Sequence, residues 1–196
     1  MDSKNEMILW DRHRALLSGF AEPDVLFGFE CLDGWLSLIG GMLCLIEKYS
    51  DESALEVRVE QVKEKFGLLR TYVRGGDIVV DRILDVAEMV SSCTCEICGE
   101  PGKHFELNGW LQVRCLNHRL PNDSGAVVCS YNEAYAVNFA KTVSLMLRLF
   151  NDKYASWLNQ ECLGLGRVSP VEALTTVQGC QAVYDLLKKM EHGVLV

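Results

Sequence analysis

The chain has 196 residues, 49% of them hydrophobic, and a formal net charge of −8. This length and apolar share suffice for a buried core in one large or two small domains, which indicates a globular protein. Residues 1–120 hold 13 lysines and arginines against 20 aspartates and glutamates. Nucleic-acid binding by so acidic a chain alone is disfavoured, and the composition leaves room only for a local basic patch.

The cysteine content and the hydropathy of the chain indicate in which cellular compartment the protein is expected. The nine cysteines could form a secreted disulfide scaffold, but the chain is too long and too rich in core residues to need one. Residues 1–6 lack the apolar stretch of a signal peptide. We therefore expect reduced cysteines in the cytoplasm. The most apolar segment, Trp35 to Ile46, is shorter than the roughly 20 residues that cross a bilayer, so no membrane span is predicted.

The first predicted elements are a helix and two strands. A helix is expected from Asp33, with Asp33 as its N-cap, because apolar residues recur at three- and four-residue steps from Trp35 to Ile46. From Leu55 onward, apolar and charged residues alternate as in a strand with one buried face. Leu69 to Val73 predicts a second strand, and the two strands together predict a hairpin.

A second helix is predicted after Gly75-Gly76. Asp77 can cap it, and an apolar stripe runs from Val79 to Val90. A short strand pair around Gly102 and Gly109 should follow. The residues expected to pack inward from that strand pair are Trp110, Leu111 and Val113. Residues 1–120 are therefore expected to form a small α/β-hairpin domain.

A group of cysteines with one histidine indicates a metal site in this first domain. Cys95-x2-Cys98 and Cys115-x2-His118 provide four thiolate or imidazole ligands, with 16 residues between the pairs. Tetrahedral zinc binds such sets, and the turn in Cys-x2-Cys lets two sulfurs converge on one ion. Four protein ligands leave no open position, so the sequence predicts a structural Zn²⁺ site rather than a catalytic one.

Other interpretations of these residues stay open at this point. Cys93 or His104 could replace one of the four ligands, or the cysteines could be small buried hydrophobes without metal. The carboxylates of Glu96 and Glu106 leave an open, catalytic metal site as an alternative. A thioredoxin-like redox motif is disfavoured, because it requires a helix after the Cys-x2-Cys and here a helix precedes it.

The C-terminal part is predicted to be a separate, all-helical domain. The polar segment 121–125 has the composition of a linker, so we place a linker at residues 121–131 and a domain at 132–196. A helical run is expected from Asn132 to Phe150, and a shorter one from Lys153 to Gln160. The predicted fold class is thus α+β, in which a small zinc-binding domain precedes a helical domain.

The last thirty residues carry the clearest helix signals. Ser169 and Glu172 fit a capping box, with Pro170 at the first helical position. Thr175 or Thr176 can cap the next helix, which should end near Gly193. His192 in the last turn can interact with the helix dipole.

The N-terminal part resembles a group of small phage- and prophage-associated proteins without an assigned activity. The resemblance rests on three segments, which are Gln61 to Arg70, Cys95 to Gly102, and Gly109-Trp110. It implies a zinc fold and an origin in a mobile element, but no function.

The C-terminal part, about residues 132–196, resembles the toxin-binding domain of Xre/MbcA/ParS-type antitoxins. The resemblance rests on Trp157-Leu158-Asn159, on Gly166-Arg167 ahead of Ser169 to Leu174, on Gly179, and on the ending Glu191 to Val194. It implies a domain that binds and neutralises a RES-type toxin, which acts on NAD. The residues that it places at the toxin are Arg167, Glu191, His192, Gly193, Val194, Leu195 and Val196. The family's helix-turn-helix is replaced here by the zinc-type module, so DNA binding is not carried over.

Two functions are therefore weighed for a chain that needs no catalytic residues. The first is an antitoxin-like inhibitor, which blocks access of NAD to a RES-type toxin. The second is a phage- or prophage-encoded regulator that binds a host defence or toxin protein, with the zinc domain as its specificity or oligomerisation element. A zinc or cysteine enzyme and a zinc-dependent transcription factor are weaker alternatives. Whether the chain forms a homo-oligomer is left open.

Overall fold

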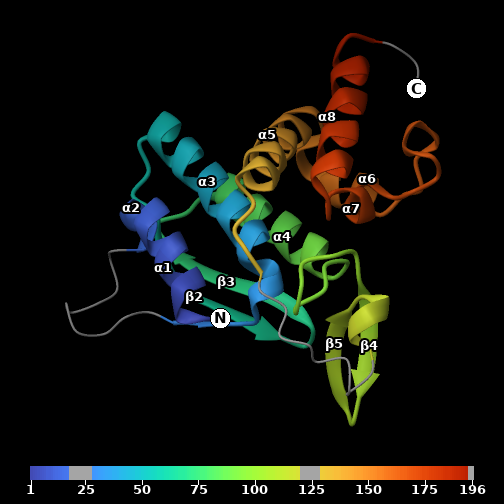
Figure 1. Ribbon diagram of the computed structural model, residues 1–196. Coiled ribbons are helices and arrows are strands. Elements are labelled where there is room, and N and C mark those ends of the chain that lie inside the picture. Colours follow the sequence, from blue (N-terminus) through green and yellow to red (C-terminus); the bar gives the residue numbers. More distant parts are fainter. Residues whose placement is uncertain (18–27, 120–128, 194–196) are drawn as a thin grey trace.

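The computed structural model describes residues 1–17, 28–119 and 129–193 and shows a mixed α+β protein (Figure 1). Its α-helices are α1 (Ser3–Arg12), α2 (Arg14–Leu17), α3 (Leu36–Ser53), α4 (Ile78–Ser91), α5 (Glu133–Phe150), α6 (Tyr154–Leu158), α7 (Pro170–Ala173) and α8 (Val177–Glu191). Its strands are β1 (Phe29–Glu30), β2 (Arg58–Lys65), β3 (Leu68–Arg74), β4 (Lys103–Leu107) and β5 (Trp110–Arg114). The strands lie in the N-terminal part and helices make up the C-terminal part, as the fold class predicted.

The larger sheet has the strand order β1-β2-β3. Strands β2 and β3 form the predicted antiparallel hairpin, although β2 begins at Arg58 rather than at Leu55. Phe66 and Gly67 both have positive φ, 58° and 74°, as in a two-residue hairpin turn. The sequence did not predict β1, which pairs in parallel with β2 and is only two residues long.

The predicted N-cap of the first long helix is wrong. Asp33 lies in a short 3-10 turn (Asp33–Trp35), and α3 begins at Leu36 without a side-chain cap. The carboxylate of Asp33 instead accepts the backbone amide of Asp2, with an O···N distance of 2.8 Å. A long-range contact with the N-terminal segment thus replaces the local cap, which no pattern around residue 33 could reveal.

The N-terminus of α4 is capped as predicted. Asp77 Oδ1 accepts the amide hydrogens of Val79 and Val80, at 3.0 and 3.1 Å, and Oδ2 accepts the hydroxyl of Tyr49 at 2.8 Å. Desolvation acts to raise the pKa of this carboxyl, but the hydrogen bonds from Tyr49 and the two amides outweigh it and hold the pKa below its ordinary value.

We expect Asp77→Ala to lower the free energy of unfolding by about 1 kcal/mol at neutral pH, because two helix amides lose their acceptor. The pKa of the folded state lies below that of the unfolded state. The stabilisation is therefore fully present above about pH 4 and is lost as the pH falls through the lowered pKa. Urea unfolding at pH 7 and pH 3 measures it, and an equal cost at both pH values would contradict a role for the ionised carboxylate.

The second strand pair, β4–β5, forms as predicted, but two of its expected inward residues point outward. Val113 is fully buried, whereas Trp110 is 72% and Leu111 44% exposed. The hairpin extends away from the core beside the larger sheet (Figure 1), so among the described residues Trp110 is left largely exposed. The prediction of inward packing was therefore correct for Val113 and wrong for Trp110 and Leu111.

The predicted capping signals of α7 and α8 are confirmed, and Asn132 provides a cap for α5 that the sequence analysis did not predict. Asn132 Oδ1 accepts the amide of Tyr135 at the start of α5, and Thr176 Oγ1 accepts the amide of Gly179 at the start of α8. A capping box with Ser169 and Glu172 begins α7. Gly179 has no room for a side chain, because a Cβ there would lie 1.8 Å from the carbonyl oxygen of Ala173. Close contact between α7 and α8 thus depends on this glycine.

One hydrophobic core extends across the predicted domain boundary. Its buried residues come from α3 and β2 as well as from α5 and α8. Helix α5 packs on α3, where a Cβ at Gly41 would lie 3.0 Å from the ring of Phe139 and 3.2 Å from the backbone of Ala136. The division into domains 1–120 and 132–196 stays a prediction, and residues 121–128 of its linker lie outside the described residues.

None of the helices within the described ranges combines the length and the apolar character that crossing a membrane requires.

Candidate metal centre and partner surface

The four predicted metal ligands come together in the structure. The ligand atoms of Cys95, Cys98, Cys115 and His118 all lie within 4.8 Å of one another. Cys95 and Cys98 lie in the turn after α4, Cys115 follows β5, and His118 ends a 3-10 turn (Leu116–His118). The cluster could therefore hold a metal ion. Cys93 and His104 are not members of this cluster.

Two of three distances within the cluster match those around a tetrahedral ion, and the third is shorter. The sulfurs of Cys98 and Cys115 are 3.7 Å apart, and Nδ1 of His118 lies 3.6 Å from the sulfur of Cys95 and 3.2 Å from that of Cys115. Bonds of about 2.3 Å to sulfur and 2.1 Å to nitrogen in a zinc tetrahedron separate ligand atoms by about 3.6–3.8 Å. A disulfide is excluded for these residues, because its sulfurs would be about 2.05 Å apart.

The two thiols of the Cys-x2-Cys turn have different environments. Desolvation acts to raise the pKa of Cys95, but hydrogen bonds from the backbone of Cys115, Cys98 and Ile97 lower it below its ordinary value. Burial raises the pKa of Cys98 to about 12, and the neighbouring charge of Cys95 adds to this effect. Backbone amides thus already favour a thiolate at one ligand position.

A buried ion pair supports the cluster, and sequence reasoning missed its role. Glu96 Oε1 accepts the amide of Val113 at 2.6 Å, and Glu96 Oε2 lies 3.0 Å from Nη1 of Arg114. Burial raises the pKa of Glu96, while the Val113 amide and Arg114 oppose this rise. The carboxylate therefore joins the first cysteine turn to β5. This use of both oxygens disfavours Glu96 as the base of an open catalytic site, and Glu106 lies on β4.

The metal cluster is attached to the start of α3. Trp35 Nε1 donates to the carbonyl of Thr94 at 2.9 Å, and the amide of Gly34 donates to the carbonyl of Glu96 at 2.8 Å. A Cβ at Gly34 would lie 2.2 Å from the carbonyl oxygen of Cys95, so only glycine fits there. The cysteine turn thus rests directly on the N-terminal core rather than on a flexible linker.

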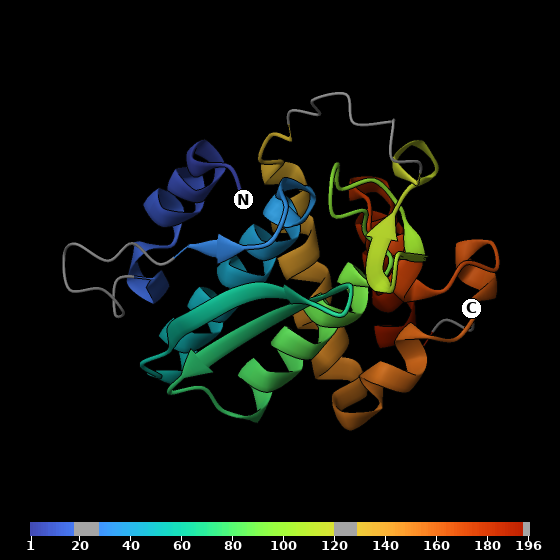
Figure 2. The same cartoon turned by 90° about the horizontal axis from the view of Figure 1, so that it is seen from below.

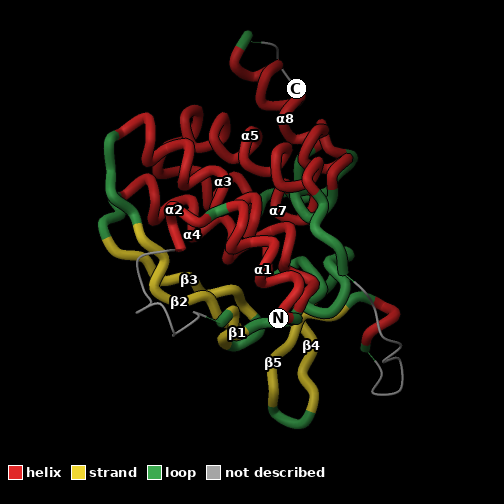
Figure 3. The backbone as a smooth tube through the Cα atoms, turned by 60° about the vertical axis from the view of Figure 1, so that its left-hand side comes forward, coloured by secondary structure: helices red, strands yellow, loops and turns green. Residues whose placement is uncertain are grey.

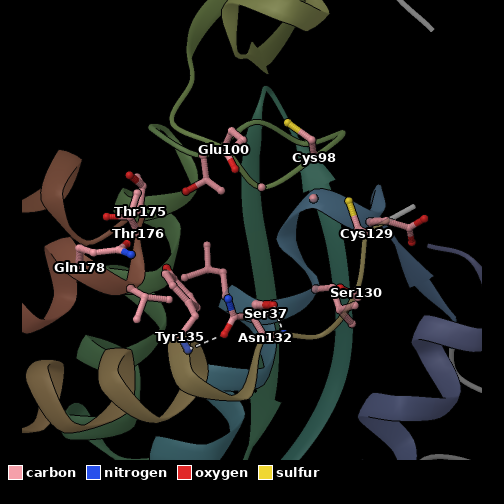
Figure 4. A pocket seen from close by; sticks show the side chains of 17 residues that line it. Ser37, Cys98, Glu100, Cys129, Ser130, Asn132, Tyr135, Thr175, Thr176 and Gln178 are labelled. Atoms are coloured by element: carbon pink, nitrogen blue, oxygen red, sulfur yellow. Dashed lines mark hydrogen bonds between the residues drawn. The ribbon is translucent and has the colours of Figure 1, made fainter. Parts of the chain in front are cut away.

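A cavity of about 420 Å³ lies where the cysteine turn meets the C-terminal helices. Figure 4 shows Cys98 and Cys129 at one end of it and Thr175, Thr176 and Gln178 at the other. The sulfur of Cys129 donates to the carbonyl of Ile97 at 2.9 Å. Parts of the chain from both sides of the predicted boundary therefore line a single space.

Arg167 lies in an exposed loop between α6 and α7. Its φ of +67° follows that of Gly166, +70°, and its amide donates to the carbonyl of Cys162 at 2.9 Å. Left-handed backbone is costly for a residue with a Cβ, and such strain is often retained at functional sites. Two apolar neighbours are also exposed, Leu163 by 77% and Val168 by 41%.

The loop with Arg167 contacts the same helix, α8, whose last residues are the other predicted contact residues. The loop packs against the middle of α8, where a Cβ at Gly164 would lie 2.7 Å from Leu186, and Figure 1 shows it beside that helix. Glu191 pairs with Arg148 at 2.5 Å and with Lys188, and these bonds lower its pKa, that to Lys188 most strongly. His192 and Gly193 are exposed and end the helix. Val194, Leu195 and Val196 lie outside the described residues.

Comparison with protein families identifies the class to which this region is similar. Residues 148–193 match the antitoxin Xre/MbcA/ParS C-terminal toxin-binding domain. The match begins at the last turn of α5 and includes the Arg167 loop, the capping box and α8. It confirms the predicted resemblance, over a shorter range than residues 132–196.

A curated relative supports the same class. The chain is 30% identical over 88 residues to an antitoxin Xre of Photorhabdus laumondii subsp. laumondii. The aligned region is 43% of this chain and 58% of that protein, so the chain spans less than two thirds of its relative. No solved structure matches significantly. The resemblance of the N-terminal part to phage-associated proteins stays a prediction.

Proposed function

We propose that this chain is an antitoxin-type inhibitor that binds and neutralises a toxin through its C-terminal helices. The observation that carries the proposal is the match of residues 148–193 to a toxin-binding domain. The proposed target is a RES-type toxin that acts on NAD, as the resemblance of this domain implies. Inhibition by docking requires a surface and no catalytic residues, so the chain is proposed not to be an enzyme.

The exposed loop around Arg167 and the end of α8 are the proposed contact surface. Arginine with exposed apolar neighbours is typical of the residues that dominate binding energy at protein interfaces. Here Arg167 lies between Leu163 and Val168, which are 77% and 41% exposed. The amide of Arg167 donates to the carbonyl of Cys162, so the backbone of the loop is already ordered and less entropy is lost on binding. Residues 192–196 are proposed to extend this surface.

The metal cluster is proposed to hold a structural Zn²⁺. Three sulfurs and one imidazole nitrogen are a typical zinc donor set, and four protein ligands close the coordination shell. Glu96 then joins the cysteine turn to β5 through Val113 and Arg114, and Trp35 joins it to the start of α3 through Thr94. In this proposal the ion stabilises the fold and takes no part in a reaction.

Arg167→Glu is expected to weaken inhibition of a RES-type toxin about tenfold or more, because a reversed charge would face the surface that arginine binds. The measurement is NAD consumption by the purified toxin at increasing concentrations of this protein. The wild-type chain should inhibit at a stoichiometric ratio.

A chain lacking residues 192–196 should also inhibit less while its melting temperature stays close to that of the wild type.

The matched control is Arg14→Glu, which makes the same charge change at a side chain of α2 that is 74% exposed. It should inhibit as the wild type does. If Arg167→Glu inhibits equally well, the proposed surface is wrong although the chain can still be an antitoxin. If the wild-type chain neither binds nor inhibits the toxin, the RES-type target is wrong, and a partner recovered from the native host would replace it.

A further inference from the structure

One face of the larger sheet is not covered by any described helix. Figure 3 shows the helices on one side of strands β1 to β3, and Figure 2 shows the other side open toward the viewer. The core side carries Val59, Val62 and Leu69, all buried. The strand register places alternate residues of the hairpin on the opposite, open side. We call this open side the outer sheet face.

The outer sheet face is basic in an otherwise acidic protein. Alternation from the buried residues assigns to it Gln61, Lys63, Lys65, Leu68, Tyr72 and Arg74, with Glu30 on β1, and Glu60 at the irregularity of β2 reaches Arg74. Arg58 and Arg70 also alternate to this side, but their guanidinium groups bond to Ala15 of α2 and Glu88 of α4. Residues 58–74 contain five lysines and arginines against two glutamates, whereas the whole chain has a net charge of −8. The local basic patch that the composition left room for thus lies on this hairpin.

Three of these cations, the arginines, have polar partners, and the two lysines form no ion pair with a described residue; Arg58 donates to the carbonyl of Ala15 at 2.8 Å. Arg74 pairs with Glu60 at 2.7 Å, and Arg70 pairs with Glu88 of α4 at 2.6 Å. Lys63 and Lys65 form no ion pair with any residue that the structure describes. The register also places Lys63 opposite Arg70 and Arg58 opposite Arg74. Like charges directly opposite each other destabilise a sheet, and Glu30 and Glu60 offset this repulsion only in part.

Exposed aromatic rings accompany the unpaired lysines. Tyr72 is 43% and Phe66 66% exposed. The ammonium of Lys63 lies 5.1 Å from the centre of the Tyr72 ring, and that of Lys65 lies 5.5 Å from the centre of the Phe66 ring. Each ring is therefore accessible to a ligand and has a cation beside it.

We propose that the outer sheet face binds single-stranded nucleic acid. Lysines would contact the phosphates, and unpaired bases would stack on Tyr72 and Phe66. Single-stranded binding proteins combine a positive surface with exposed aromatic rings, because every base offers a ring face for stacking. A protein partner fits less well, since lysine is depleted at protein interfaces. Strand β2, roughly 25 Å long at 3.3 Å per residue, suits a site of about four nucleotides or more.

The neighbouring β4–β5 hairpin borders the outer sheet face at one end. It extends beyond the plane of the sheet at the end where the β2–β3 turn lies (Figures 1 and 3). A Cβ at Gly67 in that turn would lie 3.3 Å from the backbone of Leu111 and 3.4 Å from the ring of His104. Cys115 of the cluster directly follows β5, so a metal ion bound there would also hold the hairpin in its position beside the sheet.

The test is fluorescence anisotropy of the full-length protein with a labelled oligothymidylate of about ten nucleotides and with a duplex of the same length. The single strand should bind and the duplex should bind much less, because its base faces are already stacked. With about three phosphate contacts, affinity should fall about 20-fold as salt rises from about 50 to about 200 mM.

Two pairs of variants separate stacking from charge. Tyr72→Ala should weaken binding about tenfold, while Tyr72→Phe, which keeps the ring, should bind within about twofold of the wild type. Lys63→Glu should weaken binding and reduce its salt dependence, while Lys153→Glu, on an exposed turn away from the sheet, should do neither. The side chains of Tyr72 and Lys63 lie at the surface, and thermal unfolding confirms that each variant is folded.

Three results would overturn the proposal. They are no binding of the single strand at low salt, equal binding of the duplex, and equal binding by Tyr72→Ala and the wild type. Because the assay contains no toxin, its outcome is independent of the proposed inhibition.

Discussion

Replacing Cys98 by serine is expected to remove the metal ion from the protein and to lower its free energy of unfolding by about 4 kcal/mol or more. A structural zinc site contributes much of the folding energy of the segment that it ties together. Here that segment contains β4 and β5, and its backbone carbonyls accept hydrogen bonds from Trp35 and Gly34 just before α3. Without the ion, the clustered thiols provide no comparable link between the cysteine turn and β5.

Metal content and thermal unfolding of purified protein check this expectation. The wild type should contain one zinc per chain, and a strong chelator should lower its melting temperature toward that of Cys98→Ser. The matched control is Cys44→Ser, a cysteine on α3 outside the cluster, which should retain the ion. Wild-type protein without metal, or Cys98→Ser protein with a full equivalent, would show that the four residues do not form a zinc site.

Phe139→Ala is expected to lower the free energy of unfolding by about 4 kcal/mol and the melting temperature by about 10 °C. The ring is fully buried between α5 and α3, close to Gly41, and it stacks on Tyr135 with ring centres 5.9 Å apart. Its removal leaves a cavity in the core that both parts of the chain share. The whole described structure should therefore unfold at the lower temperature in one transition.

The experiment follows unfolding by circular dichroism and by tryptophan fluorescence, which should give coincident transitions. Phe139→Leu is the control, since a smaller change of volume should cost less than about 1.5 kcal/mol. Two separate transitions, of which only one moves in Phe139→Ala, would contradict a shared core. They would support the division into domains at residues 121–131 that the composition of the sequence predicts.

Local signals were sufficient wherever a residue acts on its own neighbours in the chain. The caps at Asp77 and Thr176 and the capping box at Ser169 involve amides two or three positions away, so their residue types identify them. The β2–β3 hairpin follows from alternation along two segments and a short turn between them. These features need no knowledge of the rest of the fold.

Local signals could not predict contacts between residues that are far apart in the sequence. Asp33 binds the amide of Asp2 instead of capping α3, and Glu96 pairs with Arg114 instead of standing free beside the cluster. Trp110 is exposed because its hairpin extends away from the core, although its residue type suggested burial. Each outcome depends on which segment happens to lie nearby in space, and spacing along the chain does not encode that.

The sequence alone identified the four residues of the Cys/His cluster and the similarity of the C-terminal helices to a toxin-binding domain, because the spacing of cysteines and the order of short motifs are local properties. Only the tertiary structure decided that α3 and α5 share a core and that the lysines of β2 lie on an uncovered face. Whether a charged strand face is open or covered depends on how helices pack around the sheet. That packing arises from contacts between residues far apart in the chain, which no local pattern specifies.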